Sequence, residues 1–181
     1  MKSYIPHYYE FQQGDWEIFE ELARTVSVDA ETGMKIVVFD PERFRQDGEF
    51  VISKDEDRLH LCFSDDEEVR VPEGVKAIAP SAFNMDICPN VKHIILSDTV
   101  VGIAQHAICG HSVEELTINN KYIYISDWAF DHCPSLRLIH HVPEQVTIHV
   151  REDNERWSRP VKLEHMSSYV PENDDNDDLP F

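Results

Sequence analysis

Histidine and cysteine are the residues of this chain best suited to binding a metal or acting as a nucleophile, with ten of the first and four of the second. Three close pairs stand out: Cys109 with His111, His132 with Cys133, and His140 with His141. None has the ligand spacing of a structural zinc site, and the sequence contains no His-Glu-x-x-His. Neighbouring histidines on a strand also point to opposite faces. We therefore predict no metal site and no cofactor.

Motifs for catalysis are also missing from the sequence. The six glycines form neither a GxGxxG loop nor a P-loop, and no GxSxG turn occurs. The cysteines form no CxxC pair, and most lie beside apolar positions, which indicates reduced thiols in a core. We predict no catalytic residues and a protein that is not an enzyme. An unrecognised hydrolase or metalloprotein stays open as an alternative and would depend on His132, Cys133 or His140.

The elements that would position any site come from a motif repeated three times between Val75 and His141. The repeats run 25, 22 and 23 residues, and all variation in length falls in one gap. Insertions confined to one loop per turn are typical of a solenoid. Each copy has six matching slots, and every residue in them except His141 is apolar: Ile78, Ala82, Phe83, Val91, Ile94 and Leu96; Ile103, Ala107, Ile108, Val113, Leu116 and Ile118; Ile125, Ala129, Phe130, Leu136, Ile139 and His141.

Two of the three copies resemble the BspA-type leucine-rich repeat, whose pattern is roughly I-P-x-x-V-x-x-I-x-x-x-A-F-x-x-C-x-x-L-x-x-I. The matching segments are VPEGVKAIAPSAF with CPNVKHIIL, and ISDWAFDHCPSLRLI. The second copy departs from the pattern, because Ile108 replaces the Phe and Cys109 comes early. The resemblance covers residues 69–150. It implies a short solenoid of three to four coils with parallel strands spaced by about 4.8 Å.

Two sets of equivalent residues would mark the stacking of these coils. We expect Ala82, Ala107 and Ala129 to lie where the backbone turns inward and only a methyl group fits. The large apolar residues that follow them, Phe83, Ile108 and Phe130, would stack as a ladder. Many relatives with this repeat are secreted or surface proteins with long arrays, and we do not extend their adhesive role to this short chain.

The whole chain is expected to be α/β, mostly β. We assign residues 1–63 to an N-terminal α/β cap, 64–150 to the solenoid, 151–170 to a C-terminal cap segment and 171–181 to a disordered acidic tail. Within the N-terminal cap we predict a helix from an N-cap at Asp15 to about Val26, a buried strand over 34–39, and a hairpin of 49–52 with 58–63.

Alternate side chains on the predicted strands would face outward from one sheet. They are Glu68 and Arg70, His93 and Ile95, Glu115 and Thr117, and Leu138 and His140. We predict that these residues, with Glu67 and Glu114 beside them, form a partner-binding surface with Ile95 and Leu138 as a small exposed apolar patch. The alternative is that the N-terminal cap covers this face.

The charge of the chain bears on the kind of partner. It has 35 acidic and 16 basic residues, a net charge of −19, and residues 1–71 account for −10 of it. Such a field attracts basic proteins and repels nucleic acids and anionic membranes, so we expect no direct binding to either of these. The alternative explanation of the charge is ordinary solubility.

We therefore predict a non-enzymatic protein-binding module, in its sharpest form an acidic inhibitor or antidote that docks a basic nucleic-acid-handling enzyme. Examples of such a role are a phage anti-CRISPR inhibitor of a Cas nuclease and a bacterial immunity protein against a nuclease toxin. The alternative is a self-associating scaffold or a general adaptor, with a homodimer possible. Because no signal peptide or transmembrane segment is recognisable, we expect a cytoplasmic location.

Overall fold

A computed structural model of the chain describes residues 12–109, 112–126, 128–130 and 133–142, and the backbone of 147–150 and 162–165. One helix and sixteen short strands are found in this part of the chain. They are α1 (Asp15–Thr25), β1 (Ser27–Val28), β2 (Lys35–Ile36), β3 (Phe44–Asp47), β4 (Phe50–Ser53), β5 (Arg58–Cys62), β6 (Glu68–Arg70), β7 (Ala77–Ile78), β8 (Phe83–Asn84), β9 (His93–Ile95), β10 (Gly102–Ile103), β11 (Ile108–Cys109), β12 (Glu115–Ile118), β13 (Tyr122–Ile125), β14 (Leu138–His141), β15 (Thr147–Val150) and β16 (Lys162–His165).

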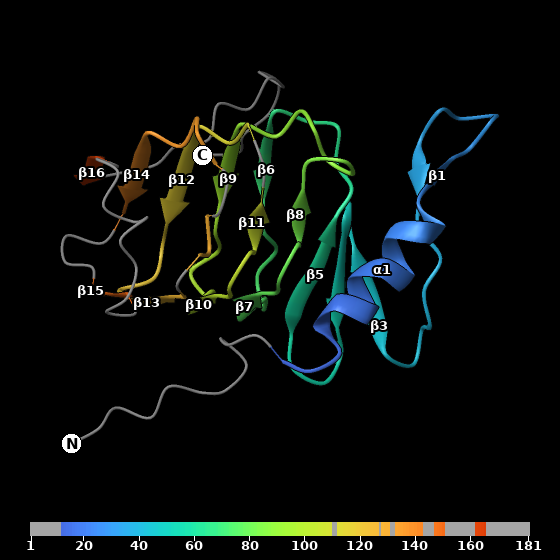
Figure 1. The fold of residues 1–181 in the computed structure, drawn as a ribbon, viewed down its shortest axis with the longest axis horizontal. Helices are drawn as coiled ribbons and strands as arrows, with labels where there is room; N and C mark the ends of the chain where they lie inside the picture. The colour runs from blue at the N-terminus through green and yellow to red at the C-terminus, as the bar shows by residue number, and fades with distance from the viewer. Residues whose placement is uncertain are drawn as a thin grey trace, which may run out of the picture.

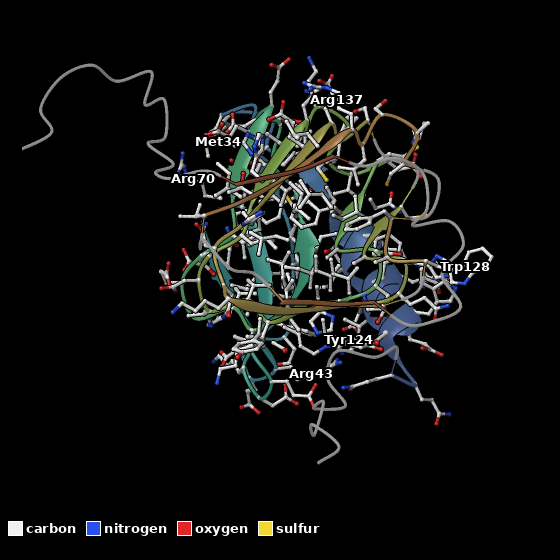
Figure 2. All side chains as sticks on the ribbon, turned by 90° about the vertical axis from the view of Figure 1, so that its left-hand side faces the viewer. Met34, Arg43, Arg70, Tyr124, Trp128 and Arg137 are labelled. Carbon is white, nitrogen blue, oxygen red and sulfur yellow. The ribbon has the colours of Figure 1, made fainter. Side chains whose placement is uncertain are left out.

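The repeats form a parallel-stranded solenoid, as the sequence predicts (Figure 1). On one side lies a seven-stranded sheet in the order β15-β13-β10-β7-β5-β4-β3, and on the other a five-stranded sheet in the order β16-β14-β12-β9-β6. Equivalent residues of successive coils are in register, for example Ile78 with Ile103 and Ile103 with Ile125. Their side chains fill the space between the two sheets, where most of the apolar repeat positions are fully buried (Figure 2).

The three alanines line up from coil to coil, which confirms the predicted stacking. Ala82, Ala107 and Ala129 are fully buried. The residue before each of them has a positive φ, which turns the chain inward: 61° at Ser81, 56° at His106 and 61° at Trp128. A side chain in this left-handed region is strained by an amount on the order of 1–3 kcal/mol.

Backbone hydrogen bonds between coils hold these strained turns in place. The amide of Ser81 donates to the carbonyl of His106 at 2.8 Å, and the amide of His106 donates to the carbonyl of Trp128 at 3.0 Å. The large residues that follow the alanines stack as well, because Phe83 pairs with Ile108 between β8 and β11. Phe130 is half-buried and packs against the same core.

The N-terminal region is joined to the solenoid through a shared strand. The predicted hairpin is present as β4 and β5, which pair antiparallel, and β5 also pairs in parallel with β7 of the first coil. Helix α1 packs against this hairpin through Leu22, in a second apolar core with Phe44, Val51, Leu61 and Phe63. In the seven-stranded sheet β7 of the first coil is therefore covered by β5, whereas β6 is the outermost described strand of the five-stranded sheet.

Two local predictions for this region are wrong. Asp15 does not cap α1, because Gly14 occupies the N-cap and the Asp15 side chain is buried against Arg58 instead. The strand predicted over 34–39 is only the two residues of β2, and it is not buried: Met34, Ile36 and Val38 are exposed. Only Val37 and Phe39 reach the apolar core. Among the described residues β2 pairs with β1 alone, so its other edge has no strand partner there.

At the other end, β16 continues the five-stranded sheet by pairing with β14. The segment 151–161 and the predicted acidic tail at 171–181 lie outside the described residues. Within the described part of the chain, no helix has the length and apolar character that crossing a bilayer would require.

Candidate functional site

The outward residues predicted from the sequence lie together on the five-stranded sheet, in two columns that cross its strands. One column contains Glu68, His93, Glu115 and Leu138, and the other contains Arg70, Ile95, Thr117 and His140. Each residue is directly opposite its neighbour in the next strand. The spacing of the repeats therefore brings together residues that are 22 to 25 positions apart in the sequence.

The glutamates of this face are matched by basic side chains. Lys92 Nζ lies 2.9 Å from Glu67 Oε1, and Arg70 Nη2 lies 3.0 Å from Glu68 Oε1. Arg137 contacts both remaining glutamates, Glu115 at 2.8 Å and Glu114 at 3.6 Å. In Figure 2 the labelled Arg70 and Arg137 extend from the outside of the molecule.

Lys92 and Arg137 were missed by the sequence analysis. The signal that would have found them is the slot just before each strand, which contains Glu67, Lys92, Glu114 and Arg137 in successive coils. Since the signs alternate, the charges of this column largely cancel, and the face itself is only weakly acidic.

Two histidines lie within this charged network. His93 Nδ1 is 3.4 Å from Glu68 Oε2, and His140 Nε2 is 3.0 Å from Glu115 Oε2. Burial lowers the pKa of His93, although the charges of Glu68 and Glu115 oppose this shift. Burial would raise the pKa of Glu115, but the hydrogen bond with His140 and the nearby positive charges outweigh it and lower that pKa. The network therefore favours an ionised Glu115.

The middle of the face is less exposed than predicted. Ile95, Thr117 and His140 are buried, with exposed fractions of 4%, 0% and 9%, and Leu138 is half-buried. The expected exposed patch of Ile95 and Leu138 is therefore wrong for Ile95. The physical reason is the close strand spacing, which lets the long side chains of neighbouring strands cover a short residue such as Thr117.

One contact on the face has the order of groups found in a nucleophilic triad. Thr117 Oγ1 lies 2.7 Å from His93 Nε2, and the other nitrogen of His93 faces Glu68. A hydroxyl activated in this way attacks substrates only when it is accessible. Because Thr117 is fully buried, we read the contact as one that orients the side chains of the face. Sequence reasoning had no signal for it, since the three residues come from different coils.

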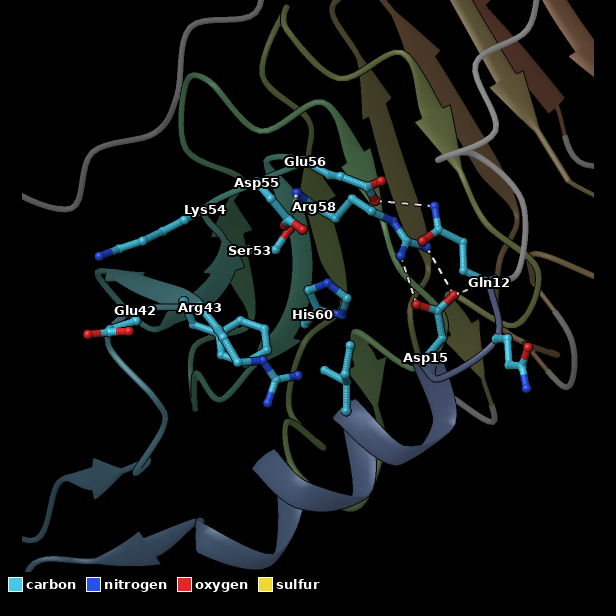
Figure 3. Close-up of a pocket in the computed structure, with 13 residues that line it drawn as sticks. Gln12, Asp15, Glu42, Arg43, Ser53, Lys54, Asp55, Glu56, Arg58 and His60 are labelled. Atoms are coloured by element: carbon cyan, nitrogen blue, oxygen red, sulfur yellow. Dashed lines mark hydrogen bonds and ion pairs between the residues drawn. The ribbon is translucent and has the colours of Figure 1, made fainter.

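A second candidate site is a cavity of about 400 Å³ in the N-terminal region, which the sequence analysis did not foresee (Figure 3). It lies between the start of α1, strand β3 and the β4–β5 turn. Its lining residues are Gln12, Gln13, Asp15, Ile18, Glu42, Arg43, Phe44, Ser53, Lys54, Asp55, Glu56, Arg58 and His60.

A buried ion pair forms one wall of this cavity. Arg58 Nη1 and Nη2 donate to the two carboxylate oxygens of Asp15 at 2.7 and 3.1 Å, and both side chains are only 2% exposed. Such a two-pronged pair is geometrically specific. It joins the first turn of α1 to β5, so it fixes the position of the helix relative to the hairpin.

His60 lies in the same cavity and is 3% exposed. Its ring packs edge-on against Phe44 at 5.7 Å between centroids. Burial, assisted by the charge of Arg58, lowers the pKa of His60 from 6.5 to about 4. The imidazole is therefore neutral at pH 7, with one nitrogen able to donate and the other able to accept a hydrogen bond.

This pKa predicts how stability depends on pH. Between pH 6.5 and 4 the unfolded chain takes up a proton at His60 and the folded chain does not. The unfolded state therefore gains stability as the pH falls, and the free energy of unfolding decreases by about 3 kcal/mol over this window. Urea titrations at pH 7 and pH 4 measure it. The free energy of unfolding of the variant His60→Gln should decrease less between pH 7 and pH 4 than that of the wild type. An equal decrease in both proteins would contradict the lowered pKa of His60 as its cause.

In the described segments no three or more His, Cys, Asp or Glu side chains are grouped so as to hold a metal ion. His111 and His132, two of the residues considered above, lie outside those segments. Cys62, Cys88 and Cys133 are buried free thiols, as expected for core residues. The hydrogen bond between Cys88 and Cys62, together with burial, raises the pKa of Cys88.

The stacked coils, the aligned alanines and the parallel pairing of the repeat strands define a short leucine-rich-repeat solenoid. Residues 61–151, half of the chain, match the family described as "BspA type Leucine rich repeat region (6 copies)". The chain belongs to this family, and the repeat fold is typical of modules that bind other proteins. Comparisons with curated proteins and with solved structures gave no match.

Proposed function

We propose that this protein is a non-enzymatic binding module that docks a basic protein partner, and that the partner is a nucleic-acid-handling enzyme which it inhibits. The observation that carries the proposal is the distribution of acidic side chains over the fold. Residues 12–71 contain 17 acidic and 7 basic residues. Of these acidic side chains only Asp15 is buried. The surplus charge is therefore displayed on the N-terminal region.

In this proposal the partner contacts the outer face of the five-stranded sheet. Its strands are held in register, and its polar side chains are already fixed by ion pairs such as Lys92–Glu67 and Arg137–Glu115. A preorganised surface loses little conformational entropy on binding. In this view the N-terminal region steers a basic partner toward the molecule. The side chains of the five-stranded sheet that remain accessible, such as Glu68, Arg70 and Leu138, determine which partner fits.

A charge-matched pair of variants tests the steering. We expect Glu17→Gln/Glu20→Gln/Glu21→Gln, on the exposed side of α1, to slow association with a basic partner by roughly threefold to tenfold at low salt. The control Glu73→Gln/Asp86→Asn/Asp98→Asn removes the same charge from the repeats and should slow it less. The partner is first captured from host lysate at low salt, and association rates are then measured across a salt series. Captured partners that are all acidic, or rates that are independent of salt, would refute the proposal.

Self-association is a second candidate function, because one observation favours it. Among the described residues, the sheet of β1 and β2 pairs with no further strand, and the apolar side chains of Val28, Met34, Ile36 and Val38 in and beside it are exposed. An apolar strand edge of this kind can pair with another copy of itself. A light-scattering mass of one 21.0 kDa chain at high micromolar concentration would eliminate this candidate.

A further inference from the structure

The ring nitrogens of His60 stand out within the cavity of the N-terminal region. The side chain is 97% removed from solvent, since only 3% is exposed, and it faces the cavity. No described residue forms a hydrogen bond with either nitrogen, and Figure 3 shows the ring among the lining residues without such a contact. The ring nitrogens are not among the described side-chain atoms that are sealed off without a partner, so they remain reachable from the cavity, and a group that enters it can form a hydrogen bond with them.

We infer that this cavity binds a primary ammonium group, and that the group is the end of a lysine side chain of the docked partner. This inference rests on the proposed function for the identity of the partner. The binding of an ammonium group itself does not depend on that proposal. The acceptors would be a ring nitrogen of His60 and the carboxylate of Asp55.

The remaining charges around the cavity favour a cation over an anion. The positive groups already have partners: Arg58 contacts Asp15, Arg43 lies 3.4 Å from Glu21, and Lys54 donates to a backbone carbonyl. The carboxylates of Asp55 and Glu42, by contrast, have no ion-pair partner among the described residues. An incoming anion would meet these two carboxylates, whereas an ammonium group would be attracted to them.

The apolar part of the lining suits the stem of a lysine. Phe44 and Ile18 border the cavity beside His60. Lysine commonly buries its methylene chain along apolar surface and places its charge against polar groups. A volume of about 400 Å³ holds such a side chain. Since the imidazole is neutral above about pH 5, it keeps an acceptor for the ammonium group at physiological pH.

The test uses the full chain with labelled histidines and a small probe, Nα-acetyl-lysine N-methylamide. We expect the His60 ring resonances to shift saturably at millimolar probe. Nε-acetylated probe, which lacks the charge, and the norleucine analogue should produce at least fivefold weaker binding. The variant Asp55→Asn, at an exposed position, should weaken lysine binding by about threefold or more. Asp47→Asn on β3 removes an equal charge outside the cavity and should leave binding unchanged.

Either of two results would overturn the inference: no shift of His60 at 50-fold higher probe than the expected midpoint, or equal shifts with the lysine and norleucine probes. If the cavity does not bind lysine, the proposed function still stands provided that the triple variant of α1 slows association with the basic partner. Conversely, lysine binding without any captured partner would support the cavity and count against the proposed function. The two conclusions therefore fail separately.

Discussion

The variant Arg58→Met is expected to lower the free energy of unfolding by about 3–5 kcal/mol. The replacement removes the guanidinium that contacts both oxygens of Asp15 and leaves that carboxylate in a site only 2% exposed. A buried charge without its partner is among the most costly defects in a protein interior. Urea unfolding followed by circular dichroism measures the effect. A loss of this size is a large part of the total stability of a typical domain, which is only about 5–15 kcal/mol.

The double variant Asp15→Leu/Arg58→Met separates the charge from the packing. Removing both members of the pair leaves no isolated ion, so most of the lost stability should return. Wild-type and double-variant proteins should then differ by less than about 2 kcal/mol. If Arg58→Met alone costs under about 1 kcal/mol, the pair is not buried in solution as described.

The second large effect is expected at Phe83, whose side chain is completely buried, with 0% of it exposed to solvent. Its side chain lies in the ladder between the two sheets, beside Ile108 of the next coil. Phe83→Ala should lower the free energy of unfolding by about 3–5 kcal/mol, because the next coil on one side and β5 on the other are held by backbone hydrogen bonds and cannot close around the cavity that is left. Equilibrium unfolding in urea measures the loss.

Met85 provides the matched control for this prediction. It lies two residues further along the same coil, but its side chain is 48% exposed. Met85→Ala should change stability by less than about 1 kcal/mol. Similar losses for the two variants would mean that the ladder is not the packed core of the repeats, and the stacking of the coils would need revision.

The repeat region was predictable because each coil has the same neighbours as the one before it. A single set of spacings determines which residues are buried, and it repeats often enough to be recognised without knowledge of distant contacts. The positions of Ala82, Ala107 and Ala129 and the outward columns of the five-stranded sheet follow from it. The charge-matching residues Lys92 and Arg137 were present in the same pattern and were overlooked.

The N-terminal region has no repeat, and the predictions for it were less accurate. Asp15 has the residue type and position of a helix cap. Arg58 is 43 positions further along the sequence, and only the tertiary structure brings it into contact with Asp15. The segment 34–39 is apolar enough for a buried strand, yet whether its outer face is covered depends on what packs above it. The short-range pattern contains no information on either point.

The sequence by itself therefore determined the solenoid, its register and its acidic character, since these depend on local spacing and composition. Only the tertiary structure decided that Ile95 and Thr117 are covered, that the glutamates of the sheet are paired, and that His60 lies beside a cavity. These features depend on side chains that meet across strands and around a helix, and such contacts have no fixed separation along the chain.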